Sequence, residues 1–174
     1  MVTVLAIIET HGYTAKLRRI VRDAVETGHS VLYVSLNKTY DSLVGQFTAD
    51  KLALGRFTFI DAITPEVLKP KPQPNCLYVP LTSGIKRLED AIGETVRKRK
   101  ISLVVFDSLS SLIIYQDMRA IVQFVSRIIA TLSALNCSAV LTCLDSDEDS
   151  FLVQHVRMMV DTVTQLRQPE VGLK

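Results

Sequence analysis

Short runs of apolar, often branched residues recur along the chain and mark the places where strands are expected. Five of these runs contain almost no polar residue: Val4–Ile8, Val31–Val34, Phe57–Ile60, Leu103–Phe106 and Ala139–Cys143. An apolar run without polar alternation is typical of a strand that helices cover on both faces of a parallel sheet. A further strand is predicted from Met159 to Leu166, and Cys76–Val79 is a candidate for another short one.

The segments between these runs show the periodicity of amphipathic helices. Thr14 is expected to cap a helix that Gly28 ends, and a less regular helix is expected from Asp41 to Leu52. Apolar residues at Ile85, Leu88, Ile92 and Val96 predict a surface helix between Gly84 and Arg99. A broad apolar set after Asp117 predicts a long, largely buried helix that Asp117 caps.

The alternation of strands and helices predicts an α/β fold with three layers, α/β/α, around a mostly parallel sheet. The stretch Thr64–Asn75 carries four prolines, and we expect it to be an irregular surface connection that forms neither helix nor inner strand. Neither of its flanks has enough apolar material for a core of its own. The prediction is therefore one domain over residues 1–174.

Composition narrows the classes of function. Apolar residues make up 48% of the chain and charged residues 22%, and 20 basic against 18 acidic residues leave a net charge of +2. This balance argues against a nucleic-acid-binding or membrane surface, and Arg97–Lys100 is better explained as the basic end of a helix. No basic and apolar leader is visible, and the three cysteines lack metal-ligand spacing, so a reduced, cytoplasmic protein is expected.

Four segments, in order, resemble the RecA/KaiC-like branch of the P-loop ATPases. Gly28–Ser35 resembles that family's second strand, and Ile101–Ser110 resembles its Walker B strand, which ends on Asp107 and Ser108. Ala139–Thr142 is similar to the family's sensor strand, and Met159–Leu166 is similar to its later strand with the pattern h-x-D-x-V-h-x-L, where h is apolar. The resemblance implies a RecA-like fold in which the Ala139 strand lies between the Val4 and Leu103 strands, and ATP as the family's substrate. It also implies assembly into rings.

At the positions that bind phosphate and catalyse hydrolysis, this sequence differs from the family's pattern. In a P-loop, glycines bring backbone amides to the phosphates, a lysine reaches the β and γ oxygens, and Ser/Thr holds magnesium. Glu9–Leu17 stands at that place, keeps Gly12 and Lys16, and has Leu17 where the magnesium ligand is expected. Asn37 occupies the place of the family's catalytic glutamate. The resemblance therefore implies a degenerate Walker A motif without catalytic residues.

Two interpretations of the remaining polar positions stay open. Gly12, Thr14 and Lys16 are weak candidates for holding a nucleotide phosphate at a helix N-terminus, and solvated side chains are the alternative. Asp107 either holds a cation or is a residual carboxylate that caps a turn or pairs with Lys16. Without a nucleotide between them, we expect Lys16 and Asp107 to approach each other directly or through one water.

The acidic loop Asp145–Asp149 is expected at the same edge of the sheet, because the loops after parallel strands gather there. Asp145 and Asp147, with Asp107, are weak candidates for metal ligands, and the alternative is a solvated loop whose last member caps a helix that begins at Phe151. The three histidines lie far apart, and their spacing supports no metal or catalytic site.

The expected function is that of a non-catalytic, pseudo-ATPase domain with a regulatory or assembly role through contacts with another protein or with a second copy. The first alternative is a switch that binds ATP or ADP weakly through the remnant phosphate loop. The second is a metal-dependent enzyme that uses the acidic edge. No cofactor is expected under the first hypothesis, whereas ATP, ADP or Mg²⁺ belongs to the alternatives.

Overall fold

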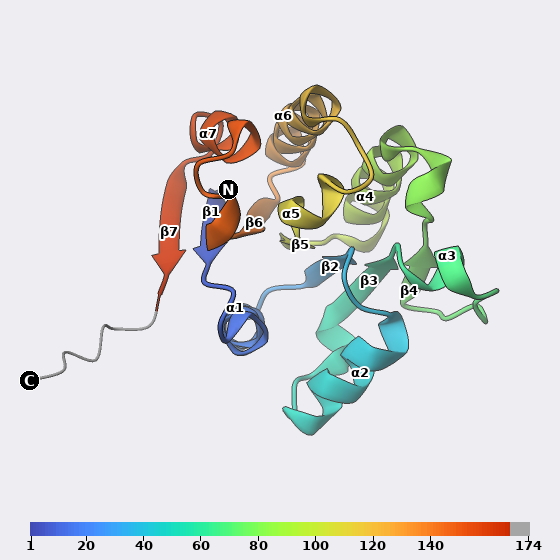
Figure 1. Cartoon of the computed structure of the whole chain (residues 1–174). Coiled ribbons are helices and arrows are strands. Elements are labelled where there is room, and N and C mark those ends of the chain that lie inside the picture. Colours follow the sequence, from blue (N-terminus) through green and yellow to red (C-terminus); the bar gives the residue numbers. More distant parts are fainter. Residues whose placement is uncertain (168–174) are drawn as a thin grey trace, which may run out of the picture.

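Seven strands, all parallel, form the sheet of the computed structural model, which describes residues 1–167. They are β1 (Thr3–Ile8), β2 (Val31–Ser35), β3 (Phe57–Asp61), β4 (Cys76–Tyr78), β5 (Leu103–Asp107), β6 (Ser138–Leu144) and β7 (Thr162–Leu166). Their order across the sheet is β4-β3-β2-β5-β6-β1-β7 (Figure 1). The prediction that the Ala139 strand lies between the Val4 and Leu103 strands is confirmed, because β6 pairs with both β1 and β5.

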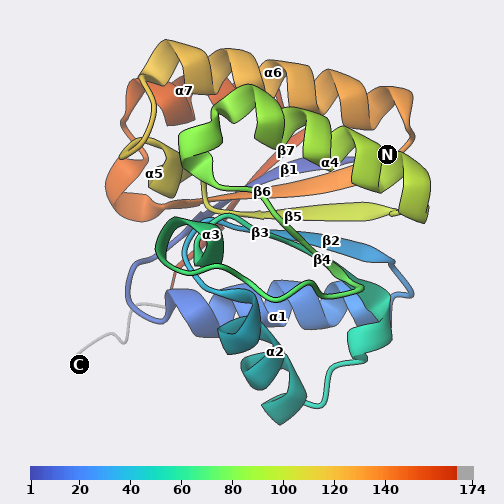
Figure 2. The ribbon, with the colours of Figure 1, turned by 90° about the vertical axis from the view of Figure 1, so that its right-hand side faces the viewer.

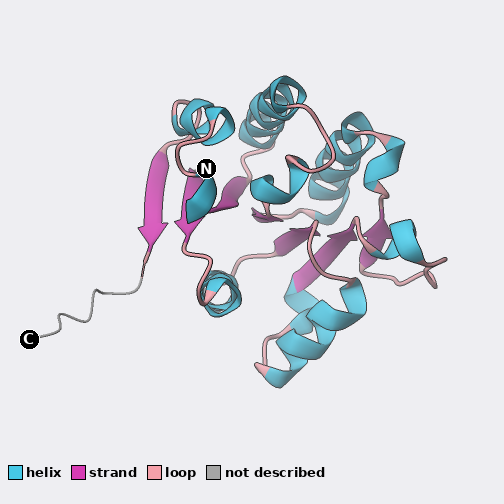
Figure 3. Ribbon diagram, in the orientation of Figure 1, coloured by secondary structure: helices cyan, strands magenta, loops and turns pink. Residues whose placement is uncertain are grey.

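Helices cover both faces of this sheet, as the apolar strands predict. They are α1 (Tyr13–Glu26), α2 (Tyr40–Ala49), α3 (Thr64–Val67), α4 (Ile85–Arg99), α5 (Leu109–Leu112), α6 (Met118–Ala134) and α7 (Phe151–Arg157). Single 3₁₀ turns occupy Leu54–Arg56, Leu81–Ser83 and Asp145–Asp147. Figures 2 and 3 show α4, α6 and α7 on one side of the sheet and α1 and α2 on the other. The three-layer α/β/α prediction is thus confirmed.

The core is divided by the sheet into two apolar clusters. The larger lies under α4 to α7 and includes Phe106 and Phe124, whose rings are 5.8 Å apart. The smaller lies under α1 and α2 and includes Tyr33 and Phe47, which meet edge to face at 5.6 Å. Successive side chains of a strand point to opposite faces, so Phe106 belongs to the first cluster while its neighbour Asp107 turns toward the second.

Four local predictions need correction. Thr14 does not cap the first helix: the helix begins at Tyr13, and Gly12 takes the cap position with φ 74°. The proline-rich stretch contains one helical turn, Thr64–Val67, because Pro65 stands in the first turn, where a missing amide hydrogen costs nothing. Ser150, not the last acidic residue, caps α7 by accepting from the Val153 amide. The last strand begins at Thr162, since Met159–Asp161 still belong to the turn before it.

Candidate functional site

Asp107 stands at the carboxyl end of β5, in the middle of the sheet, and is 1% exposed. A carboxylate removed from water this completely is stable only when hydrogen-bond donors surround it. Three side chains supply them. The Tyr13 and Tyr33 hydroxyls donate at 2.7 Å and 2.6 Å, and the Asn37 amide donates at 2.8 Å. Both carboxylate oxygens of Asp107 are therefore engaged within the protein itself.

Tyr13 reaches Asp107 from the loop that follows β1. The loop enters α1 at Gly12, whose positive φ suits glycine, and the next residue turns its ring inward. Its hydroxyl lies between Asp107 and Thr142, 2.8 Å from the Thr142 Oγ1. The Thr142 Oγ1 also lies 2.9 Å from the Phe106 carbonyl. Because a hydroxyl carries one hydrogen and that of Tyr13 goes to Asp107, Thr142 donates either to Tyr13 or to this carbonyl, and its contacts link the start of α1 to β5 and β6.

Asn37, which the resemblance predicts at the place of a catalytic glutamate, belongs to the same network. Its amide nitrogen donates to Asp107, while its oxygen accepts from the Ser111 hydroxyl. Ser111 also contacts Ser108, the residue after Asp107, at 3.1 Å. An amide can donate and accept at once, as it does here, whereas it cannot take a proton from water as a carboxylate can. In this position Asn37 orders the network rather than acting as a base.

The expected approach of Lys16 to Asp107 is wrong. The Lys16 ammonium group lies 2.6 Å from Glu9 and donates to the His11 carbonyl at 3.2 Å. Asp107 accepts its three hydrogen bonds from Tyr13, Tyr33 and Asn37 instead. Glu9 and Lys16 are seven residues apart, and their ion pair closes the loop between β1 and α1.

The other phosphate-loop candidates face different partners. The Thr14 hydroxyl accepts from the Lys38 ammonium group at 3.4 Å. Leu17 is 4% exposed and packs in the apolar cluster under α1 and α2. A cavity of about 10 Å³ remains between Thr14, Leu17 and α2, which is space for at most one water. Thr14 and Lys16 thus contact different partners, Lys38 and Glu9.

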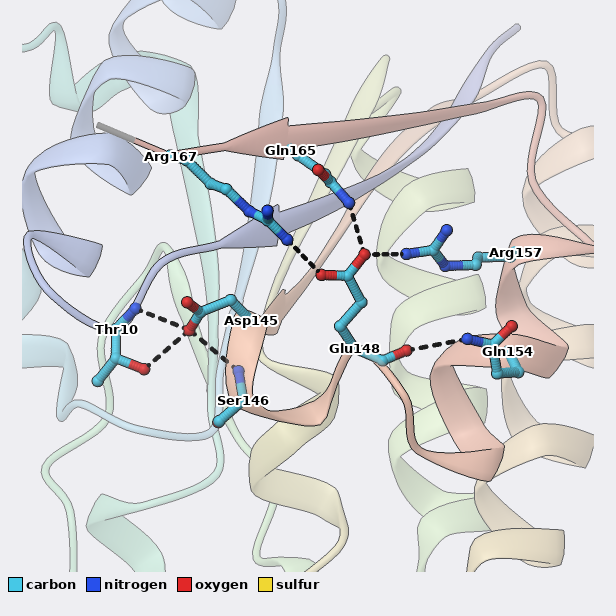
Figure 4. A network of polar contacts seen from close by, with 8 residues as sticks. All are labelled: Thr10, Asp145, Ser146, Glu148, Gln154, Arg157, Gln165 and Arg167. Atoms are coloured by element: carbon cyan, nitrogen blue, oxygen red, sulfur yellow. Dashed lines mark hydrogen bonds and ion pairs between the residues drawn. The ribbon is translucent and has the colours of Figure 1, made fainter. Parts of the chain in front are cut away.

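The acidic loop lies beside the loop after β1, at the predicted edge of the sheet, and is tied down at two points (Figure 4). Asp145 accepts from the Thr10 amide and hydroxyl, each at 3.1 Å, and from the Ser146 amide. Partial burial alone would raise the pKa of Asp145, but these hydrogen bonds outweigh it and the pKa is lowered.

Glu148 makes the second attachment of the acidic loop. Its carboxylate accepts from Arg157 on α7 at 2.5 Å, and from Gln165 at 2.5 Å and Arg167 at 2.7 Å at the end of β7. The acidic loop is therefore bonded to the segment after β1, to α7 and to the end of β7, and is not a freely solvated segment.

The metal interpretation finds no support in the geometry of residues 1–167. Among them, no three His, Cys, Asp or Glu side chains gather in a way that could hold an ion, so Asp107, Asp145 and Asp147 do not form a cluster. The cysteines are free, and burial raises the pKa of Cys137 to about 11 and that of Cys143 to about 12. Both thiols stay protonated at neutral pH and are poor ligands and nucleophiles. Over the same residues, no helix is long and apolar enough to span a bilayer.

The buried tyrosines make the network visible in an alkaline titration. Burial, and then the negative charge of Asp107, raise the pKa of Tyr13 and of Tyr33 well above its ordinary value. We expect both to stay protonated in the folded protein at pH values where ordinary tyrosines have ionised. Measured by tyrosinate absorbance, Tyr33→Phe should remove signal only from the late phase. Loss of signal near pH 10 would contradict the buried network.

The same shifts set the sign of the pH dependence of stability. In the unfolded chain these tyrosines release protons near pH 10, while the folded state retains them. Their contribution to the free energy of unfolding is therefore complete below about pH 10 and declines as the pH rises above it.

Sequence reasoning missed Tyr13, Tyr33 and Thr142 as partners of Asp107. The separations along the chain are 94 residues for Tyr13 and 74 for Tyr33, and no spacing rule connects them. Tyr13 offered one signal, because a large hydroxyl-bearing residue follows Gly12 where a phosphate loop needs small residues. Asp61 was missed as well. It is fully buried at the end of β3 and accepts hydrogen bonds that hold the starts of α2 and α3.

Comparison with known proteins addresses the fold and the family. A family model described as the KaiC ATPase matches residues 16–173 of the chain, beginning at Lys16. The structure is similar to that of a KaiC-like protein from the hyperthermophilic archaeon Pyrococcus horikoshii, with a TM-score of 0.68 and 15% sequence identity. The similarity covers 98% of this chain and 74% of that one. The search among curated proteins gave no match.

Proposed function

Because the chain belongs to the KaiC family of ATPases, we propose that it is a non-catalytic member whose role is regulation or assembly through protein contacts. The observation that carries the proposal is the state of Asp107. In a P-loop ATPase, the Walker B aspartate helps to hold the magnesium ion on the phosphates. Here three side chains take up that carboxylate, and the Tyr13 hydroxyl lies 2.7 Å from it.

The surroundings of the phosphate loop support the same proposal. Leu17 packs into the core where the family needs an oxygen ligand for magnesium, and Lys16 is held by Glu9. Phosphoryl transfer depends on positioning and on stabilising the charge of the phosphates. Lys16 pairs with Glu9, Leu17 cannot bind a metal, and Asp107 accepts hydrogen bonds from three side chains of the protein, so we infer that the residues for both tasks are missing. We expect no magnesium-dependent ATP turnover.

The alternative, a nucleotide-binding switch, has one observation in its favour. A groove of about 480 Å³ runs between α1 and the end of β7, and its lining includes Lys16, Arg19 and Arg167. Three cations near one groove suit an anionic ligand. Lys16 and Arg167 are, however, already paired with Glu9 and Glu148, at 2.6 Å and 2.7 Å. An anion would have to displace these carboxylates, which favours the non-catalytic proposal over the switch.

A melting series with MgATP and with ADP separates the two functions. A ligand present at 100 times its dissociation constant adds about 2.7 kcal/mol to the free energy of unfolding, or about 5–10 °C in melting temperature for a domain of this size. We expect a change below about 1 °C. Lys16→Ala alone should cost about 1 kcal/mol, because the ion pair that it removes is only partly shielded from water.

Lys86→Ala is the matched control, since Lys86 forms surface ion pairs with Glu89 and Asp90 on α4, outside the groove. A nucleotide-induced rise of several degrees that Lys16→Ala abolishes and Lys86→Ala preserves would establish the switch instead. Magnesium-dependent ATP turnover that disappears in Asp107→Asn would refute the non-catalytic assignment directly.

A further inference from the structure

The amino edge of the sheet, where the parallel strands begin, carries a concentration of positive charge. Five exposed cations lie there and are called the basic patch: Arg56, Arg97, Lys98, Arg99 and Lys100. Arg56 directly precedes β3, and the other four form the end of α4 and the residue after it. In Figure 2 the end of α4 and the start of β5 lie together at the right-hand side of the molecule.

Contacts between segments bring the basic patch together. Arg99 donates to the Pro74 carbonyl at 2.6 Å, before β4, and Arg56 donates to the Gly28 carbonyl at 3.4 Å, before β2. A carbonyl has no net charge and a guanidinium has five N–H donors, so both arginines keep their charge and free donors. β3 and β5 both pair with β2, which places them about 10 Å apart. One extended ligand can therefore reach Arg56 and the end of α4.

The charges of the basic patch exceed what the end of a helix needs. A helix C-terminus carries about half a negative charge, which a single cation balances. Within residues 1–167, only Lys98 of the five forms an ion pair, with Glu94 at 2.8 Å, and the side chains of Arg97 and Lys100 have no bonded partner. The acidic loop, which offsets part of this charge in the whole chain, lies at the opposite edge of the sheet. The basic patch is therefore a local source of positive potential.

A pocket of about 250 Å³ opens beside the basic patch, between β4 and the end of α4. Leu77 and Thr95 line it next to Lys98 and Arg99, and Glu94 contributes to the same wall. Leu77 keeps 44% of its surface exposed. The pocket thus offers an apolar contact directly beside two cations, which suits a ligand that carries an apolar side chain among negative charges.

Three features favour an acidic protein segment over a nucleic acid. Glu94 lies in the wall of the pocket, and Glu26 lies two residues before Gly28, so a continuous row of phosphates would meet carboxylates. A peptide can place its charges at intervals instead. The run Arg97–Lys100 contains no aromatic residue on which a base can stack. The exposed Leu77 suits an apolar side chain, which a phosphate backbone lacks.

We propose that the basic patch binds an acidic segment of a partner protein, with carboxylates on Arg56, Arg97 and Lys100 and one apolar side chain in the pocket beside Leu77. The inference rests on the proposed function, because it specifies the chemistry of the partner for a role through protein contacts. It concerns the edge of the sheet opposite Asp107 and does not depend on the loss of nucleotide binding. Exposed ion pairs each contribute little, so the affinity should be modest and should fall as salt screens the charges.

Fluorescence anisotropy of a labelled peptide measures this binding to the full chain. The probe is a fluorescein-labelled peptide of repeated Asp-Glu-Leu units, and its Asn-Gln-Leu counterpart is the uncharged control. At about 50 mM NaCl we expect saturable binding of the acidic peptide, with a Kd below about 1 mM. At about 0.5 M NaCl the affinity should fall at least about fivefold. The uncharged peptide should not bind.

Charge-reversal variants locate the binding surface. Arg97→Glu combined with Lys100→Glu should weaken binding of the acidic peptide at least about tenfold. Arg87→Glu combined with Arg119→Glu is the matched control, because it changes the net charge equally at two exposed cations near the starts of α4 and α6, at the opposite edge. It should change the affinity less than about threefold. Leu77→Ala should weaken binding of the Asp-Glu-Leu peptide and leave that of an Asp-Glu-Ala peptide unchanged, while melting temperatures report whether each variant is folded.

A wild type that does not bind the acidic peptide overturns the proposal, and so does binding that the two charge-reversal variants weaken equally. Leu77→Ala that binds both peptides as the wild type does would remove the pocket from the site. Single-stranded DNA of equal charge that binds more tightly than the peptide, and loses this affinity in the variant of Arg97 and Lys100, would assign the basic patch to a nucleic acid instead. None of these results bears on the non-catalytic assignment, which the melting series and ATP turnover measure separately.

Discussion

Asp107→Ala is expected to lower the free energy of unfolding by about 3–5 kcal/mol, because it leaves the donors of Tyr13, Tyr33 and Asn37 without their shared acceptor in a buried site. Urea unfolding of the two proteins measures the difference. The loss arises without any ligand, since the carboxylate is part of the folded network.

Two further substitutions separate the role of the charge from that of the hydrogen bonds. Asp107→Asn keeps one acceptor oxygen and the shape of the side chain, so it should cost less than Asp107→Ala. Tyr33→Phe removes one donor at 2.6 Å and should cost about 1–3 kcal/mol. Its effect should shrink once Asp107 is replaced, because the two groups form one interaction. If the free energy of unfolding of Asp107→Ala were within about 1 kcal/mol of the wild-type value, the buried network would not contribute to stability.

Asp61→Ala is expected to have an effect of similar size, about 3–5 kcal/mol, for a structural reason. Asp61 is fully buried at the end of β3, and its carboxylate accepts from the amides of Tyr40, Ile63 and Thr64 at 2.7–2.8 Å. Tyr40 is the first residue of α2 and Thr64 the first of α3. Truncation strands three amides at two helix starts, away from water.

Asp145→Ala is the matched control for Asp61→Ala. Asp145 also accepts from backbone amides, those of Thr10 and Ser146, but these bonds lie at the exposed surface of the acidic loop. Water replaces a lost acceptor there, so the cost should be at most about 1 kcal/mol. Equal losses for the two variants, measured by the same urea unfolding, would show that burial is not what makes Asp61 important.

Asp107 is surrounded by donors that come from three separate parts of the chain. The carboxylate stays at the end of β5, and two aromatic hydroxyls and an amide surround it in the protein's own interior. Tyr33 belongs to β2 and packs against Phe47, so its position is set by the core. Tyr13 is the first residue of α1, directly after Gly12, and its contacts with Asp107 and Thr142 join the start of α1 to two central strands.

The sequence by itself determined the architecture. Continuous apolar runs such as Leu103–Phe106 can be stable only between two layers of helices, and their alternation with amphipathic segments requires parallel crossovers. The resemblance of the strand segments added the order of the sheet, with β6 between β1 and β5, which the structure confirms. Local rules also sufficed at Asp117, which accepts from the Ala120 amide as the cap of α6.

Only the tertiary structure decided what the polar side chains do. Lys16 pairs with Glu9, seven residues away, whereas Asp107 accepts from Tyr13 and Tyr33, which come from other parts of the chain. The spacing of apolar residues along the chain predicts which side chains of a helix or strand are buried. It does not report which donor reaches a buried carboxylate, because that depends on how loops and strands distant in sequence meet at the edge of the sheet.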